Sequence, residues 1–209
     1  MLSPALAALV FSSSAAPRGS APVAAPNDNT RPAGTLRDGV LSLELVALDA
    51  RWHREASVAP GTPVLALAER GKRPTIPGPL VRAPAGTLVR LALHNTLAKA
   101  ITFYMPTSPT SDDSVSVPAG ATGSLETRLA TPGNYVYRAT DGTRSSRQLR
   151  IAGVMAGAVV VDSAESSRPG DRVMLILMTP DSANVAAHEA NPAMLTLDGR
   201  TDFTINGRS

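Results

Sequence analysis

The three histidines are the residues best suited to bind a metal ion, because a neutral imidazole is a common ligand for copper and zinc. They are His53, His94 and His188, and they lie in three separate segments of the chain. None belongs to a His-x-His pair, and their spacing matches no common ligand pattern. We therefore expect each of them to be an isolated surface or loop residue.

The chain contains no cysteine, which excludes several further kinds of site. Disulfides, cysteine-bound zinc and iron–sulfur clusters cannot form. A blue-copper site is excluded as well, because it needs a cysteine thiolate together with two imidazoles.

Catalytic patterns that use no metal are also weak. Asp112 and Asp113 are neighbouring carboxylates, but they lie in a Ser/Thr-rich stretch, 107–114, that we expect to be a solvated turn. The sequence has no Gly-x-Ser-x-Gly elbow for a nucleophilic serine and no Gly-x4-Gly-Lys phosphate loop. The residue patterns therefore predict no catalytic residue.

The composition argues against nucleic-acid binding and against a membrane span. The 209 residues carry a formal net charge of +3, with a sequence pI near 9.8, and only 3% of them are aromatic. A protein that binds nucleic acid usually shows a basic block or aromatic residues for base stacking, and neither is present. No run approaches the roughly 20 apolar residues that a membrane span requires.

The N-terminal 35 residues differ in composition from the rest. An apolar stretch at 5–11 precedes small residues at 12–16, which resembles the end of a secretory signal without its positively charged leader. This predicts a periplasmic or secreted protein; a disordered Ala/Ser/Pro tail or a misassigned start codon is the alternative. Residues 17–35 are rich in Pro, Ala, Asn and Gly, so we expect a flexible linker there and order from about Asp38.

Short apolar runs, separated by turn signals about every 8–12 residues, predict an all-β sandwich. We expect strands over 40–48, 64–68, 80–82, 87–94, 100–105, 124–129, 134–138, 148–151 and 155–162. Their alternation predicts a core of Leu41, Leu43, Leu45, Val89, Leu91, Leu93, Leu125, Leu129, Tyr135 and Val136. Trp52 is expected to be buried. Residues 181–190 are the only stretch whose composition favours a helix.

Two segments resemble the scaffold of the first plastocyanin-like (cupredoxin) domain of multicopper oxidases. They are residues 77–95, which begin Pro-Gly-Pro-Leu-Val-Arg, and residues 132–137, Pro-Gly-Asn-Tyr-Val-Tyr. Residues 172–178 and 202–209 resemble the first strands of a second such domain. The resemblance implies a Greek-key cupredoxin-like β-sandwich over 36–162, after a signal-like or disordered segment at 1–35. A partial second cupredoxin-like domain would follow at 163–209.

In that family, two His-x-His pairs follow these segments and hold a copper cluster. Carried over, the first pair falls on Tyr104 and Pro106, and the second on Arg138 and Thr140. Proline has no side-chain donor, and the permanent positive charge of arginine repels a metal ion. The resemblance therefore implies copper in the family, but no metal-binding, cofactor-binding or catalytic residue in this chain.

Three functions stay open. The first is a degenerate, non-catalytic structural or interaction domain from a family that oxidises substrates while reducing oxygen. The second is a partial sequence of an active copper-dependent oxidoreductase, because the Asn206–Gly207 turn predicts a return strand that would follow Ser209; a genuine short protein is the alternative to such a fragment. The third is a β-sandwich module that binds a glycan or a protein through exposed aromatics on one face, for which Trp52, Tyr104 and Tyr137 are few and scattered. The resemblance is compatible with a homo-oligomer or with association with the remaining cupredoxin domains of such an oxidase. The sequence does not indicate which small-molecule substrate would bind.

Overall fold

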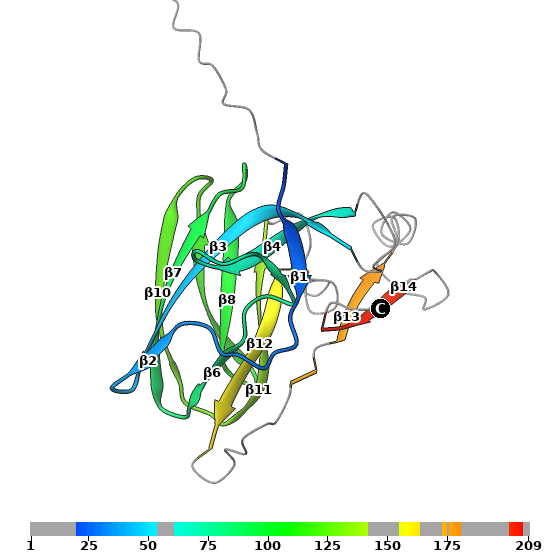
Figure 1. The fold of residues 1–209 in the computed structure, drawn as a ribbon. Coiled ribbons are helices and arrows are strands. Elements are labelled where there is room, and N and C mark those ends of the chain that lie inside the picture. The colour runs from blue at the N-terminus through cyan, green and yellow to red at the C-terminus, as the bar shows by residue number, and fades with distance from the viewer. Residues whose placement is uncertain are drawn as a thin grey trace, which may run out of the picture.

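All regular secondary structure in the described part of the chain is β (Figure 1). The computed structural model describes residues 20–53, 61–141, 155–163, 173–174, 176–180 and 201–206. The strands are β1 (Val23–Pro26), β2 (Thr35–Arg37), β3 (Val40–Trp52), β4 (Thr62–Glu69), β5 (Thr75–Ile76), β6 (Val81–Pro84), β7 (Thr87–Asn95), β8 (Ile101–Ser108), β9 (Ser111–Val117), β10 (Thr122–Leu129), β11 (Gly133–Thr140), β12 (Ala156–Asp162), β13 (Ile176–Pro180) and β14 (Thr201–Ile205). The expected all-β class is confirmed. The expected segments 148–151 and 181–190 lie outside the described residues.

Two sheets form the sandwich, and a third, smaller sheet lies beside it. The larger sheet has seven strands in the order β1-β5-β4-β3-β7-β10, with β2 also paired to β3. The facing sheet has five strands in the order β6-β12-β11-β8-β9. Strands β13 and β14 pair antiparallel, with Ile176 opposite Ile205, and lie to one side of the sandwich in Figure 1.

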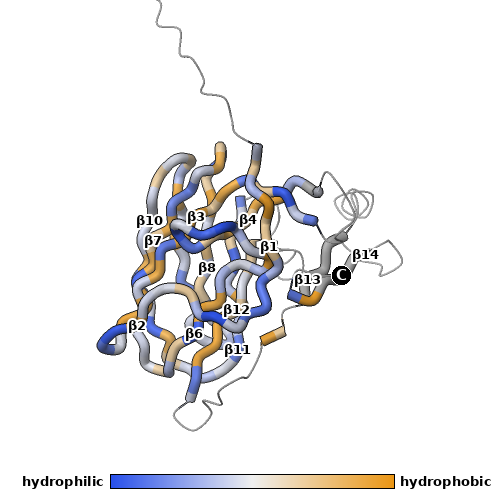
Figure 2. Tube along the Cα trace, viewed as in Figure 1, coloured by the Kyte–Doolittle hydropathy of each residue, from blue (hydrophilic) through white to orange (hydrophobic). Residues whose placement is uncertain are grey.

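Alternation along the strands produces the main core between the two sheets. Successive side chains of a strand point to opposite faces, so residues two apart share one face. Polar and apolar residues alternate along much of the sandwich (Figure 2). The expected core residues that the structure buries are Leu41, Leu43, Leu45, Val89, Leu91, Leu93 and Leu129, and Leu125 is partly buried against them.

The prediction for β11 is wrong by one residue. Val136 is 43% exposed, whereas its neighbour Tyr137 is fully buried and Tyr135 packs partly buried against the core. Two consecutive residues of a regular strand cannot both face the core. The inward positions are therefore 135, 137 and 139, and Val136 points out of the sandwich.

The predicted flexible linker at 17–35 is wrong for residues 20–35, and order begins well before Asp38. Ala24, Asn29 and Ala33 are buried. Main-chain hydrogen bonds hold this segment: Ala25 N donates to Pro74 O at 2.9 Å and Ala33 N to Leu80 O at 2.7 Å. Composition suggested flexibility, but these backbone groups find partners at the residues just before β5 and β6, more than 40 positions along the chain.

Strand β1 also closes a small ring within the larger sheet. It pairs in parallel with both β5 and the end of β3, so that β1, β5, β4 and β3 form a closed ring of paired strands. A second core fills this ring and consists of Ala24, Ala50, Trp52, Ala66 and Ile76, with Val64 packed against them. Trp52 is 1% exposed, which confirms that it is a core residue.

The expected solvated turn at 107–114 is wrong as a turn, because most of this stretch belongs to the β8–β9 hairpin, but residues 109–114 are exposed as expected. Asp112 and Asp113 lie on β9 and point to opposite faces, so they cannot act as a carboxylate pair. Asp113 Oδ2 accepts a hydrogen bond of 2.5 Å from Thr127 Oγ1 on β10. This bond links the two sheets where β9 lies against β10.

Candidate functional site

The four positions that the resemblance assigns to copper ligands lie on the outer face of the five-stranded sheet. Phe103, Met105 and Tyr137 point into the core. Their neighbours Tyr104, Pro106 and Arg138 therefore point the other way. Tyr104 and Arg138 are register partners on β8 and β11, and Thr140 lies two residues further along β11, opposite Thr102. The strand pairing thus brings these positions together.

Arg138 is held in place by two partners. Its guanidinium carbon lies 4.5 Å from the centre of the Tyr104 ring, within the range of a cation–π interaction. Its Nη2 donates to Asp112 Oδ2 at 2.7 Å, and the two side chains are only 14% and 26% exposed. The sequence pattern relates Asp112 only to Asp113 and does not link it to Arg138; its position on β9, opposite Pro106 on β8, brings it to this cluster.

The remaining two positions contribute no charge to the cluster. Pro106 and Thr140 are buried, and Pro106 has no side-chain polar atom. Arg138 Nε is buried and has no hydrogen-bond partner among the residues that the structure describes. The cluster is thus an arginine cation neutralised by one carboxylate and covered by an aromatic ring, and its chemistry is that of a structural ion pair.

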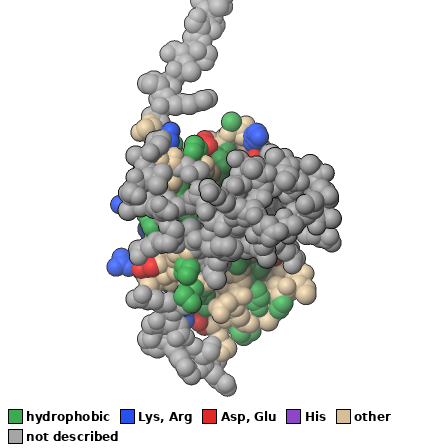
Figure 3. All heavy atoms as spheres, turned by 90° about the vertical axis from the view of Figure 1, so that its right-hand side faces the viewer, with side chains coloured by type: hydrophobic (Ala, Val, Ile, Leu, Met, Phe, Trp, Pro, Cys, Tyr) green, Lys and Arg blue, Asp and Glu red, His purple; other side chains and the backbone are tan. Residues whose placement is uncertain are grey.

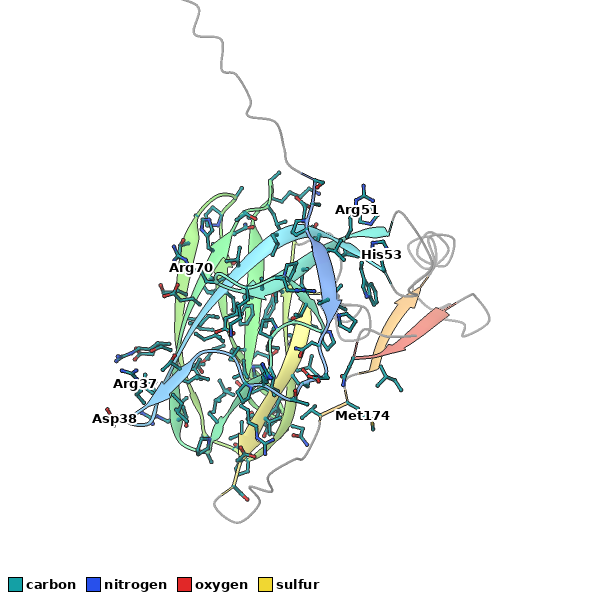
Figure 4. All side chains as sticks on the ribbon, in the orientation of Figure 1. Arg37, Asp38, Arg51, His53, Arg70 and Met174 are labelled. Carbon is teal, nitrogen blue, oxygen red and sulfur yellow. The ribbon has the colours of Figure 1, made fainter. Side chains whose placement is uncertain are left out.

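The two described histidines lie on or next to strands of the larger sheet, outside the strands that form this cluster. His94, on the outer face of β7, lies with Nδ1 3.0 Å from Thr122 Oγ1 on β10, and the donor depends on the imidazole tautomer. His53 follows the end of β3 and is half-buried near Gly61 (Figure 4). His188 lies outside the described residues. Within the described ranges no three His, Cys, Asp or Glu side chains form a group that could hold a metal ion.

Tyr137 anchors the inner side of the same strand. It is fully buried, its hydroxyl donates to Pro79 O at 2.7 Å, and its ring centre lies 5.3 Å from that of Phe103. Burial raises the pKa of Tyr137 far above its usual value, so the phenol stays neutral and remains a donor. A Cβ at Gly78 would lie 2.5 Å from the Tyr137 hydroxyl, and one at Gly157 would be closer still. The Pro77-Gly78-Pro79 signature therefore serves the packing of this phenol, which sequence reasoning did not identify.

The glycan- or protein-binding face of exposed aromatics is not present as expected. Trp52 and Tyr137 are 1% and 0% exposed, because each fills a core. Tyr104 is half-buried, and Arg138 covers one face of its ring. The three rings weighed for this alternative therefore offer no shared aromatic platform.

One depression occurs at the ends of β3 and β4 and is lined by Ala21, Asp49, Arg51, Pro63 and Leu65, among others. Its volume is about 240 Å³ and it is broadly open. Pockets for small molecules are usually larger, about 300–1,000 Å³, and more enclosed. Arg51 uses one guanidinium nitrogen to bind Gly61 O at 3.2 Å, so its position is set by the chain itself.

Solved structures, but no protein-family model and no curated protein, match the chain. A copper nitrite reductase from Nitrosomonas europaea superposes with a TM-score of 0.55 at 18% identity, over 81% of this chain and 57% of that protein. A multicopper oxidase superposes with a TM-score of 0.52 at 22% identity, over 87% of this chain and 59% of the other. The fold is cupredoxin-like. At these identities the likeness establishes the cupredoxin-like architecture alone, and the chain spans less than two thirds of either protein.

No helix in the described ranges is long and apolar enough to cross a membrane.

Proposed function

We propose that this chain is a cupredoxin-like structural or interaction domain that binds no copper and catalyses no reaction. The observation that carries the proposal is the Arg138 side chain, which stands at a position that the family resemblance assigns to a ligand. Its guanidinium is already paired with Asp112 and stacked on Tyr104. A copper ion in this place would meet a permanent positive charge.

The neighbouring residue types support the same proposal. Copper sites in proteins draw on imidazole, thiolate, thioether and carboxylate ligands. Pro106 supplies no ligand atom, and the one carboxylate in the cluster, on Asp112, is occupied by the arginine. Binding copper here would break the Arg138–Asp112 pair and leave a guanidinium that is only 14% exposed without its counter-ion.

The test is a copper-binding measurement on the whole chain. Purified protein is incubated with Cu²⁺, dialysed, and analysed for metal by plasma mass spectrometry; we expect no stoichiometric copper to remain. A variant with His53→Ala and His94→Ala identifies weak binding to surface imidazoles. One or more equivalents of copper retained by this double variant would refute the proposal.

A second candidate is that the chain is one part of an active copper-dependent oxidoreductase. It is motivated by the coverage of 57% and 59% of the two solved proteins. The test is the nucleotide sequence beyond the codon for Ser209. An open frame with a further strand, a His-x-His pair and a His-Cys-His motif would support this candidate, whereas an immediate stop codon would oppose it.

We further propose export to the periplasm or the medium, on the basis of the apolar and small residues at 5–16. N-terminal sequencing of the protein from its native cells tests this. A mature terminus after the small-residue segment supports export, and an intact Met1 in the cytosolic fraction opposes it.

A further inference from the structure

Three polar groups that are distant in the sequence meet between the sandwich and the β13–β14 pair. Asn29 Nδ2 donates to Val173 O at 3.2 Å and to Asn206 Oδ1 at 3.0 Å. Asn206 Nδ2 in turn donates to Val173 O at 3.3 Å. Asn29 is only 1% exposed. The contact therefore joins the N-terminal segment to the residue that follows β14 and to the chain just before β13.

The sandwich holds Asn29 ready for this contact. Asn27 Oδ1 accepts from Asn29 N at 3.0 Å, and Asn27 Nδ2 donates to Gly78 O at 2.8 Å. Asn29 and Asn206 both have a positive φ, 55° and 51°, a conformation that asparagine adopts more readily than most residues. Each side chain is thus directed by a backbone shape that suits its residue type.

A small apolar contact accompanies the hydrogen bonds. Val173 packs partly buried against Leu80, Ala158 and Val160, which form their own cluster on the outer face of β12. Met174, the next residue, is 72% exposed beside β13 (Figure 4). On the side of the molecule where β13 and β14 lie, the described side chains in view are mostly hydrophobic or uncharged (Figure 3).

We define the β13–β14 module as β13, β14 and the adjoining Val173 and Met174. We propose that Asn29 and Asn206 form a latch that docks this module on the apolar cluster of Leu80, Ala158 and Val160. One partly buried valine contributes little free energy of apolar burial. A buried amide group that loses its hydrogen-bond partners costs considerably more free energy. The hydrogen bonds therefore decide whether the module stays docked. Opening the latch removes Val173 from the apolar cluster.

The first test is hydrogen–deuterium exchange on the full-length chain carrying Asn29→Asp. The carboxylate has nearly the shape of the amide and tolerates the same φ, but it faces two oxygen acceptors without a donor. We expect the amides of β13 and β14 to exchange about tenfold faster or more. The amides of β3 and β7 should be unchanged. The matched control is Asn134→Asp, the same charge change at an exposed position on β11.

A distance measurement gives an independent readout. The chain has one tryptophan, which is buried, and no cysteine, so Met174→Cys provides a unique exposed labelling site. Energy transfer from Trp52 to a dye at this position should fall in the Asn29→Asp background. Acidification should partly restore it, because the introduced carboxyl group, once protonated, can again donate one hydrogen bond to Asn206.

The second variant, Asn206→Asp, separates the latch from general destabilisation. It removes the donor to Val173 O at a residue outside the sandwich. Faster exchange confined to β13 and β14 in both variants supports the latch. Unchanged exchange in both variants, or an equal loss of protection in the sandwich and the module, overturns it. The latch does not depend on the copper result, because none of its residues belongs to the Arg138 cluster.

Discussion

Removing the Tyr137 hydroxyl should destabilise the sandwich measurably. In Tyr137→Phe the ring stays in its place against Phe103, but Pro79 O loses the donor that lies 2.7 Å away in the core. A buried carbonyl left without a donor costs about 1–3 kcal/mol. We therefore expect the free energy of unfolding to fall by about 1–3 kcal/mol.

The matched control is Tyr135→Phe on the same strand. The Tyr135 hydroxyl donates to Thr131 O at 3.0 Å in an exposed setting, so water can replace it. Its removal should cost less than about 0.5 kcal/mol. The assay is urea unfolding of both variants, with the m-value checked for constancy. Equal losses for the two variants, or no loss for Tyr137→Phe, would refute the argument that burial of the phenol sets the cost.

Further predictions concern the glycine beneath this ring, the ion pairs and the ligand positions. Gly157→Ala should cost about 1–3 kcal/mol in thermal unfolding, because its Cβ overlaps the Tyr137 ring; an unchanged melting temperature would contradict this packing. Asp162→Asn should cost about 1–3 kcal/mol, because two hydrogen bonds of 2.8 and 2.9 Å join it to Arg82 and the pair is 19% and 16% exposed. Glu126→Gln breaks the Arg90 pair, whose side chains are about 60% exposed, and should cost less than about 1 kcal/mol. If chemical denaturation showed a larger loss of unfolding free energy for Glu126→Gln than for Asp162→Asn, this reasoning would be wrong. The fourfold variant Tyr104→His, Pro106→His, Arg138→His and Thr140→His should gain copper in equilibrium dialysis; a folded variant without copper would show that the ligand positions are misplaced.

Strand alternation predicted the sandwich well where one face is apolar and the other is polar. In β3 and β7 the inward leucines and valines are separated by residues such as Ser42 and Arg90, so the register is unambiguous. In β11 the run Tyr-Val-Tyr offers apolar residues on both faces. The inner face is that of the tyrosines, and it is fixed by contacts far along the chain, such as the hydrogen bond of the Tyr137 hydroxyl to Pro79 O across 58 residues.

Long-range pairing explains the larger failures. The segment 20–35 looks flexible because its composition is that of a linker, yet its backbone partners lie at Pro74 and Leu80. The stretch 107–114 looks like a turn because Ser, Thr and Asp favour turns, yet β8 supplies its ladder. In the candidate site, the resemblance pointed to Tyr104 and Arg138. The contact of Asp112 with Arg138 follows from the pairing of β8 with β9, which the sequence pattern did not predict.

The return of β1 to β3 has a consequence for solubility. Exposed strand edges invite other chains to add on and start aggregates. Within the described residues, one end of the large sheet curls back onto itself through β1, and the other end, β10, lies against β9 of the facing sheet. Strand β2 has only three residues and ends at a tight turn at Asp38 and Gly39 (Figure 4). A strand this short offers little edge for another chain to pair with. The two ends of the larger sheet are therefore less open to the addition of a strand from another chain.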